Sequence, residues 1–509
     1  MRSVLNMLIF CLQIKIIIGT DENENMVEDY TEVTTQNNIQ FDEEYTKCYG
    51  DLGCVSTDST WFQDDFRPVN LRPLELEIIK TEFILIRKNR TSSKNSIFGE
   101  VVTTNKRSIQ SSGYTTGKYL FMLIHDFTGT GYTGWVKHMT KSLKKRTKKC
   151  NVISVDWHTG AEPPYDQAVA NARVVALEII AMIRFLKENY KLTMEQVHLI
   201  GHGVGAHIAG YVGQVMKPNK ITALDPVGPR FQGMPPHVRL DPTDGDYVEI
   251  LHTDAQNIHS QGTMELLGHT DFFINNAENQ PGCPPQQSSY DLLSVTRANL
   301  NEGQILPGCS HKRAYKYYIE ALDSEECTFL GIKCTSYQEF LQGKCTNCGV
   351  NCRTFGLVTY KELNNGSYFL QTDSSLPYCM FQYRANVEIS GTRSKFYGFF
   401  QFILIDKNHF VTRSSTLEPR YFSSGTNNTF VFYTTVPEMS KIIKAKVCWK
   451  EKPSILCSLY CKQSIIVEKI SIQSINSSGR RLKKIFLCPS TETKEIFSGD
   501  FVDFTICKT

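Results

Sequence analysis

The pattern of apolar and polar positions first indicates a domain in which strands and helices alternate. Two mostly apolar runs, at 118–127 and 151–157, are typical of buried strands. Between 165 and 190, apolar residues recur at positions 168, 172, 175, 179, 183 and 186, which predicts one buried face of a long helix. Strands and helices in this order predict an α/β sheet covered by helices.

A further strand and helix enclose a glycine-rich turn. The strand expected at 197–203 runs into the sequence GHGVG (201–205), and 206–216 continues as a helix. A strand, a sharp turn with two flanking glycines and a helix form the frame of a nucleophile elbow, where the serine of G-x-S-x-G is exposed at the edge of a sheet. Gly203 stands at that central position and has no nucleophilic side chain.

The pattern and composition of the sequence change after position 352. Short segments such as YRANVEIS, FYGFFQFILI and NTFVFYTT are rich in β-branched and aromatic residues and are separated by polar turns. This predicts an all-β sandwich, with a boundary near 353–356. The predicted parts of the chain are a signal peptide (1–20), an acidic disordered arm (21–46), an α/β domain (47–352) and a β-sandwich (356–509).

The cysteine content indicates the compartment in which the protein functions. The chain has 17 cysteines, and all except Cys11 of the signal peptide fit a disulfide framework in an oxidising compartment. A zinc site at Cys345 and Cys348 is the alternative, but no second ligand pair has suitable spacing. Secretion also agrees with glycosylation sequons at Asn89, Asn365, Asn427 and Asn476. We expect no transmembrane segment, because no run outside the predicted signal peptide approaches the ~20 apolar residues that a membrane span needs. The net charge of +3 gives no indication of a nucleic-acid partner.

Several long stretches together carry a resemblance to a known family. From position 48 almost to Cys507 the chain resembles the pancreatic lipase family. The resemblance implies an α/β-hydrolase domain followed by a PLAT-like domain, which in the family contacts lipid particles or proteins. The stretches are VDWHTGAEPPYDQAVANARVVALEI (155–179), GHGVGAHIAGYVG (201–213), ITALDPVGPRF (221–231), RLDPTDGDYVEILHTDA (239–255) and CSHKRAYKYY (309–318).

The resemblance identifies two of three catalytic residues. The family uses a serine, an aspartate and a histidine in that chain order, and the matching positions are Gly203, Asp225 and His311. The histidine would act as general base and the aspartate would fix its tautomer. Removing such a nucleophile costs about 10⁶-fold in turnover in a serine protease. Asp225 and His311 would then remain as a ligand-contacting pair or as a buried structural pair.

A second departure from the family lies in the oxyanion hole. The family has His-Gly-Phe after the first core strand, whereas this chain has HDF at 125–127. The resemblance assigns the oxyanion-binding N–H groups to Phe127 and Val204. The carboxylate of Asp126 would oppose a developing oxyanion there, because like charges repel strongly in a dry site.

The resemblance also implies a structural calcium site. Its ligands would be the carbonyls of Pro236 and Arg239 and the carboxylates of Asp241 and Asp244, since Ca²⁺ prefers hard oxygen ligands. The alternative is that the DPTD sequence at 241–244 is an ordinary turn.

Disulfide pairs follow from the same resemblance. Cys283 and Cys309 would bracket a lid-length segment, whose apolar residues would cover a pocket or anchor a surface loop. These residues are Leu292, Leu293, Val295, Leu300, Ile305 and Leu306. The further implied pairs are Cys48–Cys54, Cys334–Cys345, Cys348–Cys352 and Cys488–Cys507. No pairing follows for Cys150, Cys327, Cys379, Cys448, Cys457 and Cys461.

The function expected from these features is binding without hydrolysis. We expect a secreted, inactive lipase homologue that binds lipid, a lipid-particle surface or a protein partner. The alternatives are an active triacylglycerol lipase or phospholipase A1, and a storage protein like the yolk proteins that resemble lipases. A basic run would bind an acidic glycan or anionic lipid, or be a solvated face; it comprises Lys141, Lys144, Lys145, Arg146, Lys148 and Lys149.

Overall fold

The computed structural model describes residues 45–88, 97–256, 260–284, 292–296, 308–345, 348, 351–359, 365–391, 394–414, 419–435, 442–452, 464–475, 484–490 and 494–507. The predicted signal peptide, nearly all of the acidic arm, Asn89, Asn476 and most of the predicted lid lie outside these residues. No helix in the described ranges combines the length and apolar character that a membrane crossing requires.

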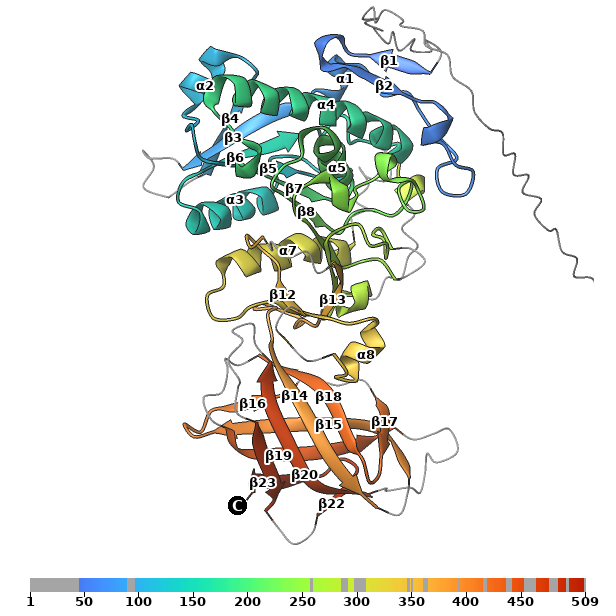
Figure 1. Cartoon of the computed structure of the whole chain (residues 1–509), viewed down its shortest axis with the longest axis vertical. Helices are drawn as coiled ribbons and strands as arrows, with labels where there is room; N and C mark the ends of the chain where they lie inside the picture. Colours follow the sequence, from blue (N-terminus) through green and yellow to red (C-terminus); the bar gives the residue numbers. More distant parts are fainter. Residues whose placement is uncertain are drawn as a thin grey trace, which may run out of the picture. The chain divides into compact units, whose positions relative to one another are not determined.

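The first sheet is the frame of the α/β domain (Figure 1). Its described part has 11 strands in the order β12-β11-β13-β10-β9-β8-β7-β5-β6-β3-β4. Neighbouring strands are parallel along β13-β10-β9-β8-β7-β5-β6. The strands are β3 (Glu82–Lys88), β4 (Ile97–Val102), β5 (Tyr119–Ile124), β6 (Cys150–Asp156), β7 (Val197–His202), β8 (Lys220–Leu224), β9 (Val248–His252), β10 (Thr270–Ile274), β11 (Leu330–Lys333), β12 (Cys352–Thr354) and β13 (Gly366–Leu370).

Helices cover both faces of this sheet, so β5 is buried on both sides. Leu120 and Met122 point into a core shared with α4 (Tyr165–Tyr190) and α5 (Val204–Met216). Phe121 and Leu123 point into the opposite core, shared with α3 (Gly134–Arg146) and α7 (Cys309–Asp323), which lie side by side. The helix predicted at 165–190 is confirmed, and its predicted apolar face is buried. Shorter helices are α1 (Leu76–Ile79), α2 (Lys106–Ser112) and α8 (Tyr337–Leu341).

The second sheet is entirely antiparallel and encloses its own core, as a sandwich that approaches a barrel. In β15 exposed or half-buried residues alternate with buried ones, which is the period of two that the sequence shows. The strands are β14 (Phe381–Ser390), β15 (Lys395–Asp406), β16 (Val411–Arg413), β17 (Arg420–Ser423), β18 (Asn427–Thr434), β19 (Ile442–Glu451), β20 (Ser464–Ile475), β21 (Ile485–Pro489), β22 (Glu495–Phe497) and β23 (Phe501–Ile506).

The first sheet extends beyond the predicted boundary at 353–356, and this part of the prediction needs correction. Strand β13 (366–370) pairs in parallel with β10 and antiparallel with β11. Its sequence, GSYFL, has the same aromatic texture as the sandwich strands. The local sequence pattern therefore could not assign β13 to the first sheet, because that assignment depends on its partner strand β10, about 100 residues away.

Disulfides link neighbouring elements in both parts of the chain. All five implied pairs are formed, including Cys48–Cys54, which closes the hairpin of β1 (Thr46–Cys48) and β2 (Cys54–Ser56). Cys345 and Cys348 are both in disulfides, so the zinc alternative is wrong. Cys327–Cys379 is an additional pair. Of the other described cysteines, Cys150 and Cys448 carry free thiols, and Cys457 and Cys461 lie outside the described residues.

Candidate active site

The elbow predicted from GHGVG connects β7 to α5. Gly203 has φ 57° and ψ −118°, a backbone conformation that a residue with a Cβ adopts only under strain. A Cβ at Gly205 would overlap the backbone of Ile124 and His125, so glycine there lets the helix approach β5 closely. The frame of a nucleophile elbow is therefore complete, and only its central side chain is absent.

The carboxylate of Asp126 fills the space above Gly203. A Cβ atom built on Gly203 would overlap the Oδ1, Cγ and Oδ2 atoms of Asp126. Asp126 Oδ1 accepts a hydrogen bond from the Val204 N–H at 2.7 Å, and Oδ2 accepts one from His311 Nε2 at 3.0 Å. The aspartate thus holds the N–H of Val204 and the Nε2 of His311, the two groups to which the resemblance assigns the oxyanion hole and the general base. Phe127, the other predicted oxyanion residue, follows directly and is buried.

Asp225 completes a chain of two carboxylates and one imidazole. His311 Nδ1 donates to Asp225 Oδ2 at 2.6 Å. Asp225 Oδ1 in turn accepts hydrogen bonds from the N–H groups of Thr253 at 2.7 Å and Asp254 at 3.1 Å. Each nitrogen of the His311 ring therefore faces a carboxylate oxygen, and both bonds require a protonated nitrogen.

Asp126, His311 and Asp225 stabilise each other's charged forms. Burial alone lowers the pKa of His311, but the hydrogen bonds and charges of Asp126 and Asp225 raise it to about 10. Burial alone raises the pKa of Asp126, but the hydrogen bond and charge of His311, with the Val204 N–H, hold it below its ordinary value. The two carboxylates therefore favour the protonated form of His311, and this form does not serve as a general base.

His202 lies against the ring of His311. The ring centroids are 4.3 Å apart, and His202 donates its Nε2–H to the carbonyl of His311 at 3.2 Å. Burial lowers the pKa of His202 to about 4, and the positive charge of His311 acts in the same direction. These effects favour the neutral imidazole at His202. The sequence analysis did not single it out, although it directly precedes Gly203.

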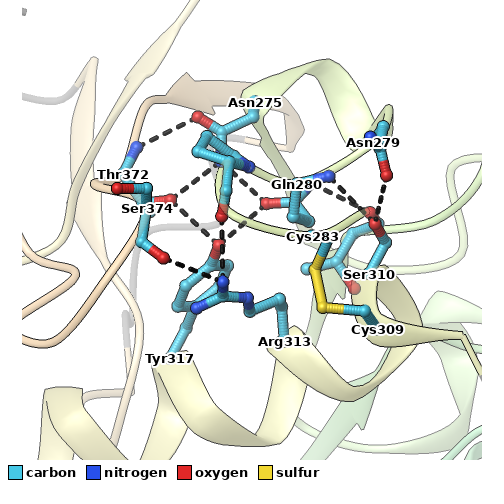
Figure 2. Close-up of a disulfide and its surroundings, with 12 residues drawn as sticks. Asn275, Asn279, Gln280, Cys283, Cys309, Ser310, Arg313, Tyr317, Thr372 and Ser374 are labelled. Carbon is cyan, nitrogen blue, oxygen red and sulfur yellow. Dashed lines mark hydrogen bonds between the residues drawn. A yellow bond between two sulfur atoms is a disulfide. The ribbon is translucent and has the colours of Figure 1, made fainter. Parts of the chain in front are cut away.

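A disulfide and a buried amide network fix the start of α7, which carries His311 (Figure 2). Cys309, the first residue of α7, is bonded to Cys283. The Gln280 side chain donates to the carbonyls of Thr253 at 2.9 Å and Ile274 at 2.8 Å, and accepts from Tyr317 of α7 at 3.0 Å. This network ties α7 to the ends of β9 and β10 and so sets the position of His311.

A cleft of about 1110 Å³ opens beside the site, between α3 and α7. Asp126 and His202 contribute to its wall. Aromatic and aliphatic residues line much of the rest, namely Phe127, Trp135, Tyr315, Ile319, Leu376 and Tyr378. The other charged residues of the lining are Lys141 on α3, Lys312 and Lys316 on α7, and the carboxylates of Glu320 and Asp323 on α7.

Comparison with known proteins gives this geometry a family. The family model described as Lipase matches residues 45–378. Inactive pancreatic lipase-related protein 1 of Canis lupus familiaris is 34% identical over 361 residues, which cover 68% of this chain and 75% of that protein. Pancreatic lipase-related protein 2 of Rattus norvegicus is 34% identical over 360 residues, with the same shares covered. Pancreatic triacylglycerol lipase of Equus caballus is 32% identical over 361 residues, which cover 68% and 76%.

The chain belongs to the Lipase family. Its relatives include proteins named as inactive and others named as lipases. Membership of the family therefore does not decide whether this protein hydrolyses esters, and only its own site bears on that question.

The calcium ligands implied by the lipase family lie together in one short segment. Asp241 precedes, and Asp244 ends, a 3-10 helix (Pro242–Asp244), and the Asp241 N–H donates to Asp244 Oδ2 at 2.8 Å. The carboxylate of Asp244 is buried, and Arg239 Nη1 is 3.8 Å from Asp241 Oδ2. The carbonyl of Pro236 accepts from the Gln214 side chain at 3.2 Å. The carboxylates of Asp241 and Asp244 thus form the capping hydrogen bonds of this turn, and a calcium site at this segment stays a prediction.

The predicted lid and the basic run are the other features that the sequence of this lipase-family chain suggested. Within the predicted lid, Leu292 and Val295 are buried in the core that contains α4, while Leu293 is exposed; the other apolar lid residues lie outside the described ranges. In the basic run, Arg146 donates to the carbonyls of Leu322 at 2.7 Å and Ser324 at 3.0 Å, at the end of α7. Part of the run is therefore structural.

Proposed function

We propose that this protein is a secreted, non-hydrolytic member of the Lipase family that binds an anionic lipid in the cleft between α3 and α7. One observation carries the proposal. The carboxylate of Asp126 is hydrogen-bonded to both groups that acyl transfer needs, the N–H of Val204 and the Nε2 of His311.

Three losses act together against ester hydrolysis. Gly203 offers no nucleophile, and His311 Nε2 faces the carboxylate of Asp126 at 3.0 Å, which favours the protonated ring over the free base that the reaction needs. An ester carbonyl oxygen would have to displace a carboxylate from the Val204 N–H, and its developing charge would meet a negative group there. These groups act as a unit in serine hydrolases, so the loss of each cannot be offset by the others.

The lining of the cleft supports an amphiphilic ligand. An aromatic and aliphatic wall suits an acyl chain, as in most small-molecule sites. Burial lowers the pKa of Lys312, and the charge of Lys316 on the next turn lowers it further. Among the described residues neither lysine forms an ion pair with a carboxylate. An anionic headgroup near them would offset this repulsion.

The first experiment tests hydrolysis. The wild-type protein should neither react with a serine-directed phosphonate nor hydrolyse tributyrin faster than a His311→Ala variant. Hydrolysis that depends on His311 would overturn the non-hydrolytic part of the proposal.

The second experiment tests the ligand. Oleate should bind and raise the melting temperature by mass action, and oleyl alcohol should bind at least about tenfold more weakly because it has no charge for the lysines. The double variant Lys312→Gln/Lys316→Gln should remove that difference. Lys137→Gln, an exposed lysine of α3 outside the cleft, is the matched control. If neither compound binds, a storage role without a lipid ligand is favoured instead.

A further inference from the structure

Asp126, His202 and His311 form a compact cluster of metal-binding side chains beside Gly203. One ligand atom from each residue lies within 4.8 Å of the ligand atoms of the other two. The three residues are 7%, 4% and 0% exposed, so bulk water does not compete freely for these atoms. Two imidazoles and one carboxylate form the protein part of many open zinc sites, where a fourth position is left for water or another ligand.

The spacing of the cluster fits a small cation. Ligand atoms at about 2.0–2.1 Å from a tetrahedral zinc ion lie roughly 3.3 Å from each other. Asp126 Oδ2 and His311 Nε2 are 3.0 Å apart, so a few tenths of an ångström of opening would admit the ion between them. The widest separation in the cluster, which is at most 4.8 Å, must close by a larger amount when the ion binds.

Outer hydrogen bonds already orient two of the three ligands. Asp225 accepts from His311 Nδ1 at 2.6 Å, which directs Nε2 toward the cluster. Histidine ligands of metal ions usually donate their second ring nitrogen to such a carboxylate, which fixes the tautomer and strengthens the ligand. The Val204 N–H holds Asp126 Oδ1 at 2.7 Å and leaves Oδ2 on the His311 side.

The buried carboxylates around His311 also favour a cation here. Oxygens of Asp126 and Asp225 lie 3.0 and 2.6 Å from the two ring nitrogens of His311, and both aspartates are buried. A divalent cation between Asp126 and His311 would compensate buried negative charge, which is costly when it is unpaired.

We propose that Asp126, His202 and His311 bind a divalent cation of the Zn²⁺ type in the place of the missing serine. Binding replaces the proton on His311 Nε2, which is released to solvent. The remaining coordination position faces the cleft, because Asp126 and His202 also line it. This inference rests on the side-chain cluster and not on the proposed lipid ligand, so either one stands if the other fails.

The experiment is a titration of the chelator-treated full-length protein with ZnCl₂ in the presence of Ca²⁺, which occupies any hard-ligand site. We expect one Zn²⁺ per chain and the release of about one proton, measured by calorimetry in buffers of different ionisation enthalpy. Co²⁺ should give the visible absorption of a four- or five-coordinate site. His202→Gln should weaken Zn²⁺ binding at least about tenfold, and Asp225→Asn about 10–100-fold.

Matched controls separate this site from adventitious binding. His138→Gln removes an exposed histidine of the same cleft, and Asp241→Ala removes a carboxylate of the calcium segment; neither should change Zn²⁺ binding. His202→Gln is the deciding variant, because His202 lies outside the hydrogen-bonded chain of Asp126, His311 and Asp225. Sub-stoichiometric binding by the wild type, or unchanged affinity in His202→Gln, would overturn the proposal.

Discussion

The space that a side chain at position 203 would need is occupied by the carboxylate of Asp126. Asp126 in this position is therefore compatible with a glycine at 203 and not with a residue that carries a Cβ. Both differ from the residues that the family places there, a serine at 203 and a glycine at 126. The two departures thus form one structural change.

Restoring the serine alone should damage the protein. Gly203→Ser places a Cβ at φ 57°, which costs about 1–3 kcal/mol of strain, and forces the Asp126 carboxylate out of its place, which costs about 1–3 kcal/mol more. The free energy of unfolding, from the denaturation midpoint, should fall accordingly. Hydrolysis of tributyrin should stay near zero. A variant as stable as the wild type would contradict the overlap.

The double variant Gly203→Ser/Asp126→Gly should reverse part of this damage. It removes the overlap and frees the Val204 N–H and His311 Nε2 for a substrate and a serine. We expect more tributyrin hydrolysis than in either single variant, because nucleophile and oxyanion donors act non-additively. Asp126→Gly alone is the control and should remain inactive. Equal activity of Gly203→Ser and the double variant would show that Asp126 does not block the site.

The pH dependence of stability should reveal the charged state of His311. Its pKa is raised from 6.5 to about 10 in the folded chain, so its contribution to stability is complete below pH 6.5 and is lost as the pH rises toward 10. Asp126→Asn removes one of the two carboxylates that raise this pKa. With chelator present, the melting temperature of the wild type should therefore fall more steeply between these pH values than that of the variant. Parallel curves would contradict the ion pair.

The amide network of Figure 2 should be a major source of stability near His311. Gln280 is 1% exposed and bonds to Thr253, Ile274, Asn275 and Tyr317. Gln280→Ala leaves these buried groups without partners, and we expect a loss of roughly 2–4 kcal/mol in unfolding free energy. The exposed Gln338→Ala is the matched control and should change stability by less than about 0.5 kcal/mol. Similar losses in both variants would rule out the role of the network.

The calcium site implied by the family is a separate prediction. Chelation with EGTA should lower the melting temperature of the wild type, because a ligand that binds only the folded chain stabilises it. Asp241→Ala should abolish that response, since it removes one of two carboxylate ligands. The exposed Asp246→Ala nearby should keep it. An unchanged melt of the wild type with EGTA would count against the site.

The sequence by itself determined the elements whose signal is local. The helix at 165–190 follows from a 3.6-residue period along one segment, and the frame of the elbow from glycines that stand within five residues of each other. The absence of a nucleophile at Gly203 is likewise a fact of one position. Residue-by-residue resemblance then supplied Asp225 and His311, which the structure brings together.

Tertiary structure alone decided how the vacant position is used. The sequence analysis expected Asp126 to repel an oxyanion, but Asp126 and His311 are 185 positions apart, and no local pattern shows that they meet. The same holds for β13, whose partner strand lies far away in the chain. Hydrogen bonds and burial between distant segments set the charge of His311, the place of His202 and the blocked Val204 N–H. These depend on packing, because the energy of a buried charge is fixed by its three-dimensional neighbours and not by its neighbours in sequence.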